Sequence, residues 1–177
     1  MSGCWWSAPC ASGLPSSTRA LTAAPAVELL WREDSLGQDK VLCRPVAVPA
    51  GARIYEIDSP EAFVRLVERY PLELTRSRRH DWWRATGATG PLLIVDYEAV
   101  AADYQGIHLT VAGYLQTAGR ALPTASGAIT VLAGWDPDKT WWLTDLEVFG
   151  ADSSWSLTDD AWVLTGPADL AAEQAQG

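Results

Sequence analysis

Residues 59–70 restrict the fold of this chain more than any other segment. Ser59 can cap a helix whose first residue is Pro60, where the fixed φ of proline is favourable, and Pro71 ends the segment. Apolar side chains recur at the i, i+3, i+4 and i+7 spacing of one helix face, namely Phe63, Leu66, Val67 and Tyr70. A helix with one apolar face is not stable alone in water, so the chain must supply a surface that covers it.

Segments that are typical of β-strands lie on both sides of this helix. Residues 41–48 and 53–57 are predicted strands joined by a turn at 49–51. Residues 92–95 form a third predicted strand, because a four-residue apolar run is too short for a helix. Asp96 can then cap a second, short helix, so helices and strands alternate through this part of the chain.

The second half of the chain is predicted to be rich in strands. Residues 107–115 alternate between apolar and polar side chains, which is typical of a strand with one buried face. Two hairpins are expected after it, one joining 128–135 to 140–148 and one joining 154–158 to 161–165. This order of elements predicts an α+β fold, with a mostly antiparallel sheet and two helices packed on one face.

Length and local composition predict one domain between two tails. A chain of 177 residues can bury a core without disulfide bonds. Residues 1–26 are rich in Ala, Ser and Pro and are expected to form a flexible leader, and residues 171–177 a frayed tail. The single α+β domain is therefore placed at residues 27–170.

The net charge of −9 is concentrated near the C-terminus. From Gly134 onward the chain has nine acidic residues and one base, Lys139. An acidic protein repels phosphate backbones, so nucleic-acid binding is disfavoured, whereas a basic protein partner remains open. The sequence leaves the oligomeric state undetermined.

Cysteine and histidine are too few and too scattered to predict a metal site. Three cysteines without a paired spacing and two histidines indicate neither a disulfide framework nor zinc, and no cofactor is predicted. Residues 136–147 have the oxygen spacing of a calcium loop, but Trp141 stands where that loop needs glycine, which favours the hairpin. No signal peptide or apolar membrane span is visible, so a cytoplasmic protein is expected.

His108 is the first candidate for catalysis. Imidazole titrates near neutral pH, and the predicted strand places His108 on one face with Thr110 and Tyr114. We expect His108 to act as the acid or base, helped by Tyr114 or by Asp103 at the end of the preceding helix. The alternative is a histidine that only hydrogen-bonds within the sheet.

Residues 76–90 read as a polar loop with the one cluster of basic and aromatic side chains. Arg78 and Arg79 could bind an anionic group through their guanidinium forks, and Trp82 and Trp83 could stack on a ligand. With Thr110, these four residues are the predicted substrate-binding set. The alternative is a solvated loop whose tryptophans cover the edge of the core.

The ten tryptophans suggest an aromatic site. Five of them lie from residue 135 onward and either pack in the core or wall a pocket: Trp135, Trp141, Trp142, Trp155 and Trp162. The favoured hypothesis is a small intracellular enzyme that acts on a small molecule in a Trp-lined pocket. A second hypothesis is a noncatalytic binding or immunity protein that uses its acidic C-terminal sheet, and the sequence does not decide whether the protein is an enzyme.

Two resemblances add expectations to these. Three groups of residues, at 53–60, 96–113 and 134–143, resemble a loose family of uncharacterised small proteins of high-GC soil bacteria, with no assigned activity. The order Arg53, Thr110, Glu147 resembles the NAD site of the ADP-ribosyltransferase fold. This second resemblance implies an NAD-dependent transferase in which those three residues form the site.

Overall fold

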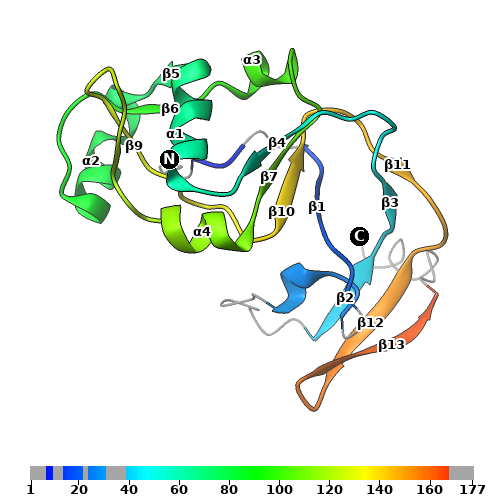
Figure 1. Cartoon of the computed structure of the whole chain (residues 1–177). Coiled ribbons are helices and arrows are strands. Elements are labelled where there is room, and N and C mark those ends of the chain that lie inside the picture. Colours follow the sequence, from blue (N-terminus) through cyan, green and yellow to red (C-terminus); the bar gives the residue numbers. More distant parts are fainter. Residues whose placement is uncertain (1–6, 10–13, 22–23, 31–38, 168–177) are drawn as a thin grey trace. The chain divides into compact units, whose positions relative to one another are not determined.

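The computed structural model describes residues 7–9, 14–21, 24–30 and 39–167, with the backbone alone at 77–81 (Figure 1). Contacts divide the chain into two compact units. The first unit comprises Met1–Ser17 and Gly51–Asp145, and the second comprises Thr18–Ala50 and Leu146–Gly177. Each unit is described by itself, and the folding of residues 27–170 as one domain stays a prediction.

A four-stranded mixed sheet forms the centre of the first unit, in the order β1-β10-β7-β4. Its strands are β1 (Ser16–Thr18), β10 (Lys139–Trp142), β7 (Gly106–Leu109) and β4 (Ile54–Ile57). β4 and β7 are parallel, whereas β7 and β10 are antiparallel. A parallel pair cannot be joined by a tight turn, so the chain between β4 and β7 makes a long crossover that contains three helices.

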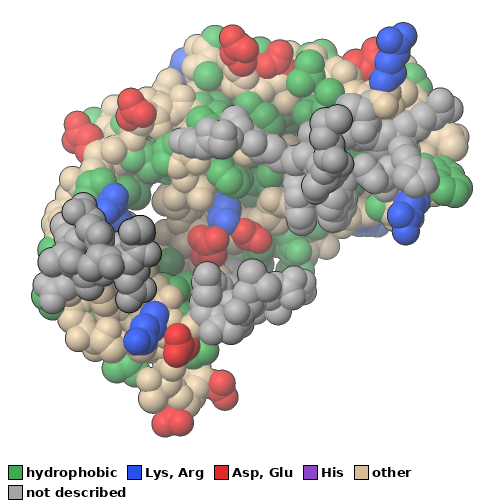
Figure 2. Space-filling model, turned by 180° about the vertical axis from the view of Figure 1, so that it is seen from behind, with side chains coloured by type: hydrophobic (Ala, Val, Ile, Leu, Met, Phe, Trp, Pro, Cys, Tyr) green, Lys and Arg blue, Asp and Glu red, His purple; other side chains and the backbone are tan. Residues whose placement is uncertain are grey.

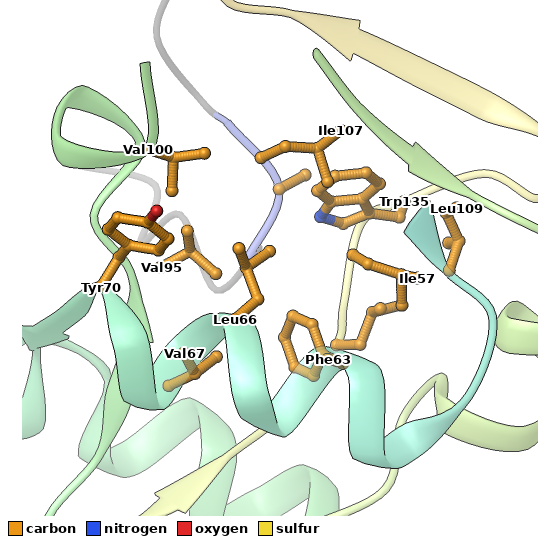
Figure 3. Packing of buried hydrophobic residues seen from close by; sticks show 12 residues of the cluster. Ile57, Phe63, Leu66, Val67, Tyr70, Val95, Val100, Ile107, Leu109 and Trp135 are labelled. Atoms are coloured by element: carbon orange, nitrogen blue, oxygen red, sulfur yellow. The ribbon is translucent and has the colours of Figure 1, made fainter. Parts of the chain in front are cut away.

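Helix α1 (Pro60–Arg69) confirms the predicted amphipathic helix. The Ser59 hydroxyl accepts a hydrogen bond from the Ala62 N–H, and Phe63, Leu66 and Val67 are fully buried. These side chains pack on residues from β4, β6 and β7 and on Trp135 (Figure 3). The shorter helix α3 (Tyr97–Ala101) confirms the second prediction, since Asp96 accepts a hydrogen bond from the Ala99 N–H.

Two small antiparallel pairs and a second apolar cluster complete the first unit. β5 (Pro71–Glu73) pairs with β6 (Leu93–Val95), and β8 (Leu122–Pro123) pairs with β9 (Ile129–Thr130). The second cluster consists of Trp82, Leu92, Ile94, Val131 and Ala133.

The second unit contains a three-stranded antiparallel sheet in the order β13-β12-β2. Its strands are β2 (Lys40–Cys43), β12 (Ser153–Thr158) and β13 (Ala161–Pro167). The predicted hairpin is confirmed: Asp159 and Asp160 connect β12 to β13, and both have positive φ, as a two-residue hairpin turn requires. β3 (Val46–Ala47) pairs with β11 (Glu147–Val148), and η1 (Val27–Leu30) is a short 3-10 helix.

Three predicted elements differ from the structure. Residues 76–90 were expected to be a loop, but Thr75–Thr86 form helix α2, whose buried Trp82 anchors it to the second cluster. The strand predicted for 107–115 ends at Leu109, because Thr110 caps helix α4 (Val111–Thr117). The hairpin predicted for 128–135 with 140–148 is absent from the described residues, since β10 pairs with β7 instead.

The α+β class is confirmed, whereas the arrangement of two helices on one face is not. The described residues contain four α-helices and several separate sheets, most of whose strand pairs are antiparallel. Three helices follow α1 because residues 75–86 and 111–117, predicted as loop and strand, are both helical.

Residues 7 and 8 of the predicted leader pack within the first unit. Ser7 donates its N–H to the Ala133 carbonyl, and its hydroxyl accepts from the Ala133 N–H at 2.7 Å. Ala8 belongs to the main core cluster. The composition of the leader alone does not predict these contacts.

We expect Gly113→Ala to destabilise the first unit. An added Cβ at this helical position would lie 2.2 Å from the Ile57 carbonyl oxygen, so α4 would have to move away from the end of β4. Alanine normally stabilises a helix relative to glycine by about 0.5–1 kcal/mol. Overpacking at residue 113 should outweigh this stabilisation. The free energy of unfolding, measured in urea, should fall by about 1–3 kcal/mol. Ala112→Leu, at the exposed neighbouring position, should change stability little, and an unchanged or more stable Gly113→Ala would contradict the expectation.

Candidate functional site

Three neighbouring strands place polar side chains in one row across the central sheet. Glu56 on β4 lies opposite His108 on β7, and Thr140 on β10 lies opposite His108 on its other side. Paired residues point to the same face of a sheet, so Glu56, His108 and Thr140 share one face. Their neighbours Tyr55 and Ile107 point to the opposite face, which packs in the core.

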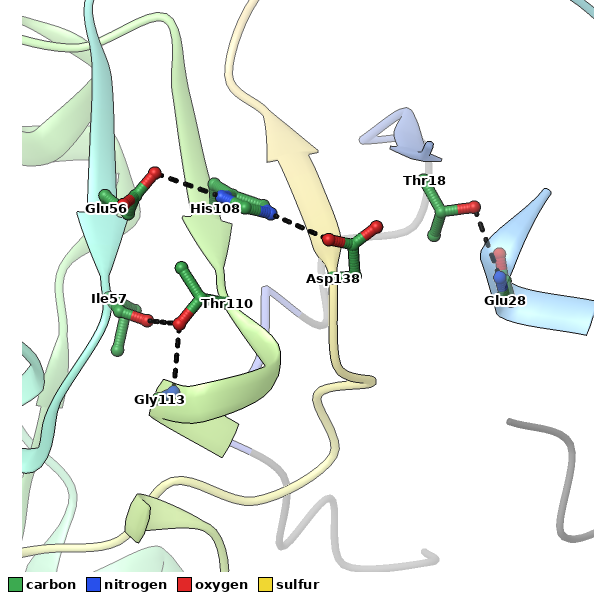
Figure 4. A network of polar contacts seen from close by, with 8 residues as sticks. All are labelled: Thr18, Glu28, Glu56, Ile57, His108, Thr110, Gly113 and Asp138. Carbon is green, nitrogen blue, oxygen red and sulfur yellow. Dashed lines mark hydrogen bonds and ion pairs between the residues drawn. The ribbon is translucent and has the colours of Figure 1, made fainter. Parts of the chain in front are cut away.

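His108 lies between two carboxylates (Figure 4). Its Nδ1 is 3.4 Å from Oε2 of Glu56, and its Nε2 is 3.7 Å from Oδ1 of Asp138. The His108 side chain is 22% exposed, Glu56 is 61% exposed and Asp138 is 3% exposed. The ring therefore has one carboxylate at the surface and one that is almost fully buried.

Asp138 reaches His108 from a strained position in the backbone. It precedes β10 in the turn that contains Pro137, and its φ of 60° is in the left-handed region. Aspartate tolerates this region better than most residues, but the conformation still costs about 1 kcal/mol or more. Next to it, Lys139 donates to the Asp136 carboxylate, which fixes both ends of the turn. A buried carboxylate is thus held in place by the surrounding fold.

The two carboxylates impose a choice on the imidazole ring. A neutral imidazole has one N–H and one lone pair, so only one of Glu56 and Asp138 can accept a hydrogen bond from it. Of the two contacts, Nδ1 to Glu56 at 3.4 Å is within hydrogen-bond distance, whereas Nε2 to Asp138 at 3.7 Å is a contact between charged groups when the ring is protonated.

Asp103, which was predicted to assist His108, has other partners. Its carboxylate accepts hydrogen bonds from the Tyr70 hydroxyl and from Arg69, at 2.9 Å for the latter. The hydrogen bond from Tyr70, together with the Arg69 charge, lowers the pKa of Asp103 below its ordinary value. The carboxylates that face His108 are Glu56 and Asp138 instead.

Thr110 is the N-cap of α4 and Tyr114 lies within α4, so neither belongs to the strand of His108. The Thr110 hydroxyl accepts from the Gly113 N–H at 2.9 Å and donates to the Ile57 carbonyl at 3.3 Å (Figure 4). Tyr114 is partly buried against the main core cluster. Both positions differ from the prediction because the strand ends at Leu109, after which helical periodicity replaces alternation.

The predicted Arg and Trp cluster lies on helix α2. Trp82 is 1% exposed and is part of the second core cluster, so it packs in the core and presents no stacking surface. Trp83 on the same helix is exposed. The side chains of Arg78 and Arg79 lie outside the described residues, so their predicted role stays a prediction.

The tryptophans of the C-terminal part are divided between the two units. Trp135 and Trp141 pack with the main core of the first unit, and Trp141 lies on the opposite sheet face from His108. Trp142 is buried and donates from Nε1 to the Ser17 hydroxyl at 2.8 Å. Trp155 and Trp162 belong to the sheet of the second unit. A pocket walled by tryptophan stays a prediction.

Glu56 and Asp138 are the site residues that sequence reasoning missed. The signal for Glu56 was present, because a polar residue between Tyr55 and Ile57 must lie on the other face of the strand. Its approach to His108 depends on the parallel pairing of β4 with β7, which joins residues 52 positions apart. Asp138 carried no comparable signal, since the sequence placed it only in the turn of a predicted hairpin.

The described part of the chain has neither a cluster of metal-ligating side chains nor a membrane-spanning helix. No group of three or more His, Cys, Asp or Glu side chains is placed to hold a metal ion. None of the described helices is long and apolar enough to cross a membrane. In the segment with calcium-loop spacing, Asp138 faces His108 and Glu147 belongs to the second unit.

Comparison of the chain with protein-family models, curated proteins and solved structures gives no match. Both resemblances therefore stay predictions. Of the three residues in the second resemblance, Arg53 and Thr110 lie in the first unit and Glu147 lies in the second.

We expect the contribution of Asp103 to stability to disappear at acid pH. Because its pKa is lowered in the folded protein, the charged carboxylate stabilises the fold above the ordinary pKa of aspartate, about 3.9. This contribution is lost as the pH falls through the lowered folded-state value. Urea unfolding of wild type and Asp103→Asn should differ at pH 7, and the difference should shrink as the pH is lowered below the ordinary pKa of aspartate. A difference that persists at the lower pH would show that the substitution acts through packing.

Proposed function

We propose that this protein is an enzyme in which His108 acts as a general acid or base on a small-molecule substrate. The observation that carries the proposal is the placement of the ring between a buried carboxylate, Asp138, and an exposed one, Glu56. A histidine with one nitrogen oriented by a carboxylate and the other accessible is a recurrent arrangement for proton transfer. Strain at Asp138 supports the proposal, because strained residues cluster at functional sites.

Each residue has a distinct role in the proposed reaction. In the proposed reaction, Nε2 approaches Asp138 and donates to it, which keeps the lone pair at Nδ1, so Asp138 is a positioning residue. Nδ1 removes a proton from the substrate and returns it in a later step. Glu56 is exposed beside Nδ1 and can bind the substrate or exchange the proton with solvent. The present distances of 3.4 and 3.7 Å exceed those of ordinary hydrogen bonds, as is common before substrate binds.

The two carboxylates also restrict which substrates can bind beside His108. Negative charge on both sides of the ring disfavours an anionic group next to His108. The proposal therefore does not include the anion contact that was predicted for Arg78 and Arg79. A cytoplasmic location is part of the proposal and is supported by Cys43, which is a free thiol in the second unit.

We expect His108→Gln to abolish turnover. Glutamine keeps a similar size and polarity but cannot transfer a proton near neutral pH. The measurement is release of p-nitrophenol from p-nitrophenyl acetate, butyrate and glycosides and of p-nitroaniline from neutral and cationic aminoacyl anilides. The loss expected is about 10²–10⁴-fold. Thr86→Ala, on helix α2, is the matched control, and equal rates for wild type and His108→Gln on all probes would overturn the proposal.

We expect Asp138→Asn to change the tautomer of neutral His108. In the wild type, the ¹⁵N shifts of the ring should show a protonated Nε2 and an unprotonated Nδ1. The chain has two histidines, so the spectrum of His108→Gln assigns the signals. Asparagine tolerates the left-handed backbone but loses the charge, and it should reduce the Nε2–H population together with the rate. Glu56→Gln is the comparison, and the same tautomer in wild type and Asp138→Asn would contradict the role of Asp138.

A further inference from the structure

The sheet face that carries His108 is negatively charged around the ring. Glu56 is exposed on the side of Nδ1, and Asp138 lies on the side of Nε2 (Figure 4). Thr140, which is opposite His108 on β10, adds a hydroxyl without charge. The two carboxylates favour a positively charged group beside the ring, since opposite charges attract most strongly where water is partly excluded.

The basic side chains next to these strands act on other carboxylates. Lys139 precedes Thr140 on β10, so it points to the opposite face of the sheet, where it donates to the Asp136 carboxylate. Arg53 directly precedes β4, and its charge contributes to the lowered pKa of Asp103. Neither base therefore takes the place of a cationic ligand beside the imidazole ring.

An apolar surface lies next to Glu56 on the same face of β4. Ile54 is two residues before Glu56, so the two side chains point to one face about 7 Å apart. Ile54 is 37% exposed. Its neighbour on β7 is Gly106, where an added Cβ would lie 3.2 Å from Cε3 of the buried Trp142. The surface beside the Glu56 carboxylate is therefore apolar.

We propose that the substrate of this site is a primary alkylamine, bound as its ammonium ion. This inference names the substrate class and rests on the proposed function. The ammonium group has three N–H donors and can donate both to Oε2 of Glu56 and to the lone pair at Nδ1 of His108, which are 3.4 Å apart. The alkyl chain lies on Ile54, where it is removed from water.

Proton transfer selects an ammonium group over other cations. A guanidinium group is not deprotonated in proteins, and a quaternary ammonium group has no N–H. In a primary ammonium ion, one N–H bond breaks, its electron pair stays on the substrate nitrogen, and the proton moves to Nδ1 of His108. The products of this step are a neutral amine and an imidazolium ion, which the carboxylates of Glu56 and Asp138 stabilise.

Binding of n-butylammonium to the full chain tests the proposal by ¹H–¹⁵N NMR at pH 7. Acidic side chains also lie at several other places on the surface (Figure 2), so general attraction of cations must be separated from binding at this site. We expect n-butylammonium to shift the backbone amide signals of Glu56, His108 and Thr140 to saturation. n-Butyltrimethylammonium, which has the same charge but no N–H donor, should bind about tenfold more weakly or less. No saturable shift, or equal binding of the two cations, would overturn the proposal.

Two substitutions test the two parts of the contact. Glu56→Gln should raise the dissociation constant of n-butylammonium about tenfold or more, whereas Glu98→Gln, at an exposed position of α3, should leave it unchanged. Ile54→Gln should weaken the binding of n-butylammonium but not that of methylammonium, which has no chain to place on residue 54. The amide spectrum shows directly that each variant is folded. Equal dissociation constants for Glu56→Gln and Glu98→Gln would contradict the ammonium contact.

Binding and turnover separate this inference from the proposed function. His108→Gln should still bind n-butylammonium, because Glu56 remains. If His108→Gln loses turnover but wild type does not bind n-butylammonium, the substrate class is wrong and the catalytic role of His108 stands. If n-butylammonium binds as expected but wild type and His108→Gln have equal turnover, the cation contact stands and the catalytic role is overturned.

Discussion

Parallel pairing of β4 with β7 is the constraint on which the first unit depends. Parallel neighbours require a crossover, and here the crossover contains α1, whose apolar face covers the sheet together with Val95, Val100 and Trp135. The same pairing brings Glu56 next to His108 in register. One set of backbone hydrogen bonds therefore fixes both the core on one face of the sheet and the polar row on the other.

The junction between β7 and α4 is the second constraint on the structure of the first unit. Thr110 caps α4, its hydroxyl lies against the Ile57 carbonyl, and Gly113 lets the helix approach the end of β4 without a Cβ in the way. This junction turns the chain away from the sheet directly after Leu109. His108 is therefore the second-last residue of β7. The site thus depends on a glycine and a cap that take no part in its chemistry.

Sequence patterns predicted helices and turns correctly where the structure of a segment depends only on residues close to it in the chain. The helix after Ser59, the helix after Asp96 and the hairpin at Asp159 and Asp160 were all correct, because capping and turn chemistry depend on adjacent residues. Helix α2 was missed because its polar composition suggests a loop, and its helical state depends on the burial of Trp82 in a distant cluster.

The amino-acid sequence by itself determined the α+β class, the amphipathic helix that needs a sheet, and the position of His108 on a strand. Tertiary structure alone decided which carboxylates face that histidine. Asp103, five residues away in the chain, is bound by Tyr70 and Arg69, whereas Glu56 lies on the neighbouring strand β4 and Asp138 in the turn directly before β10. The physical reason is that strand pairing, and not distance along the chain, sets which side chains share a face.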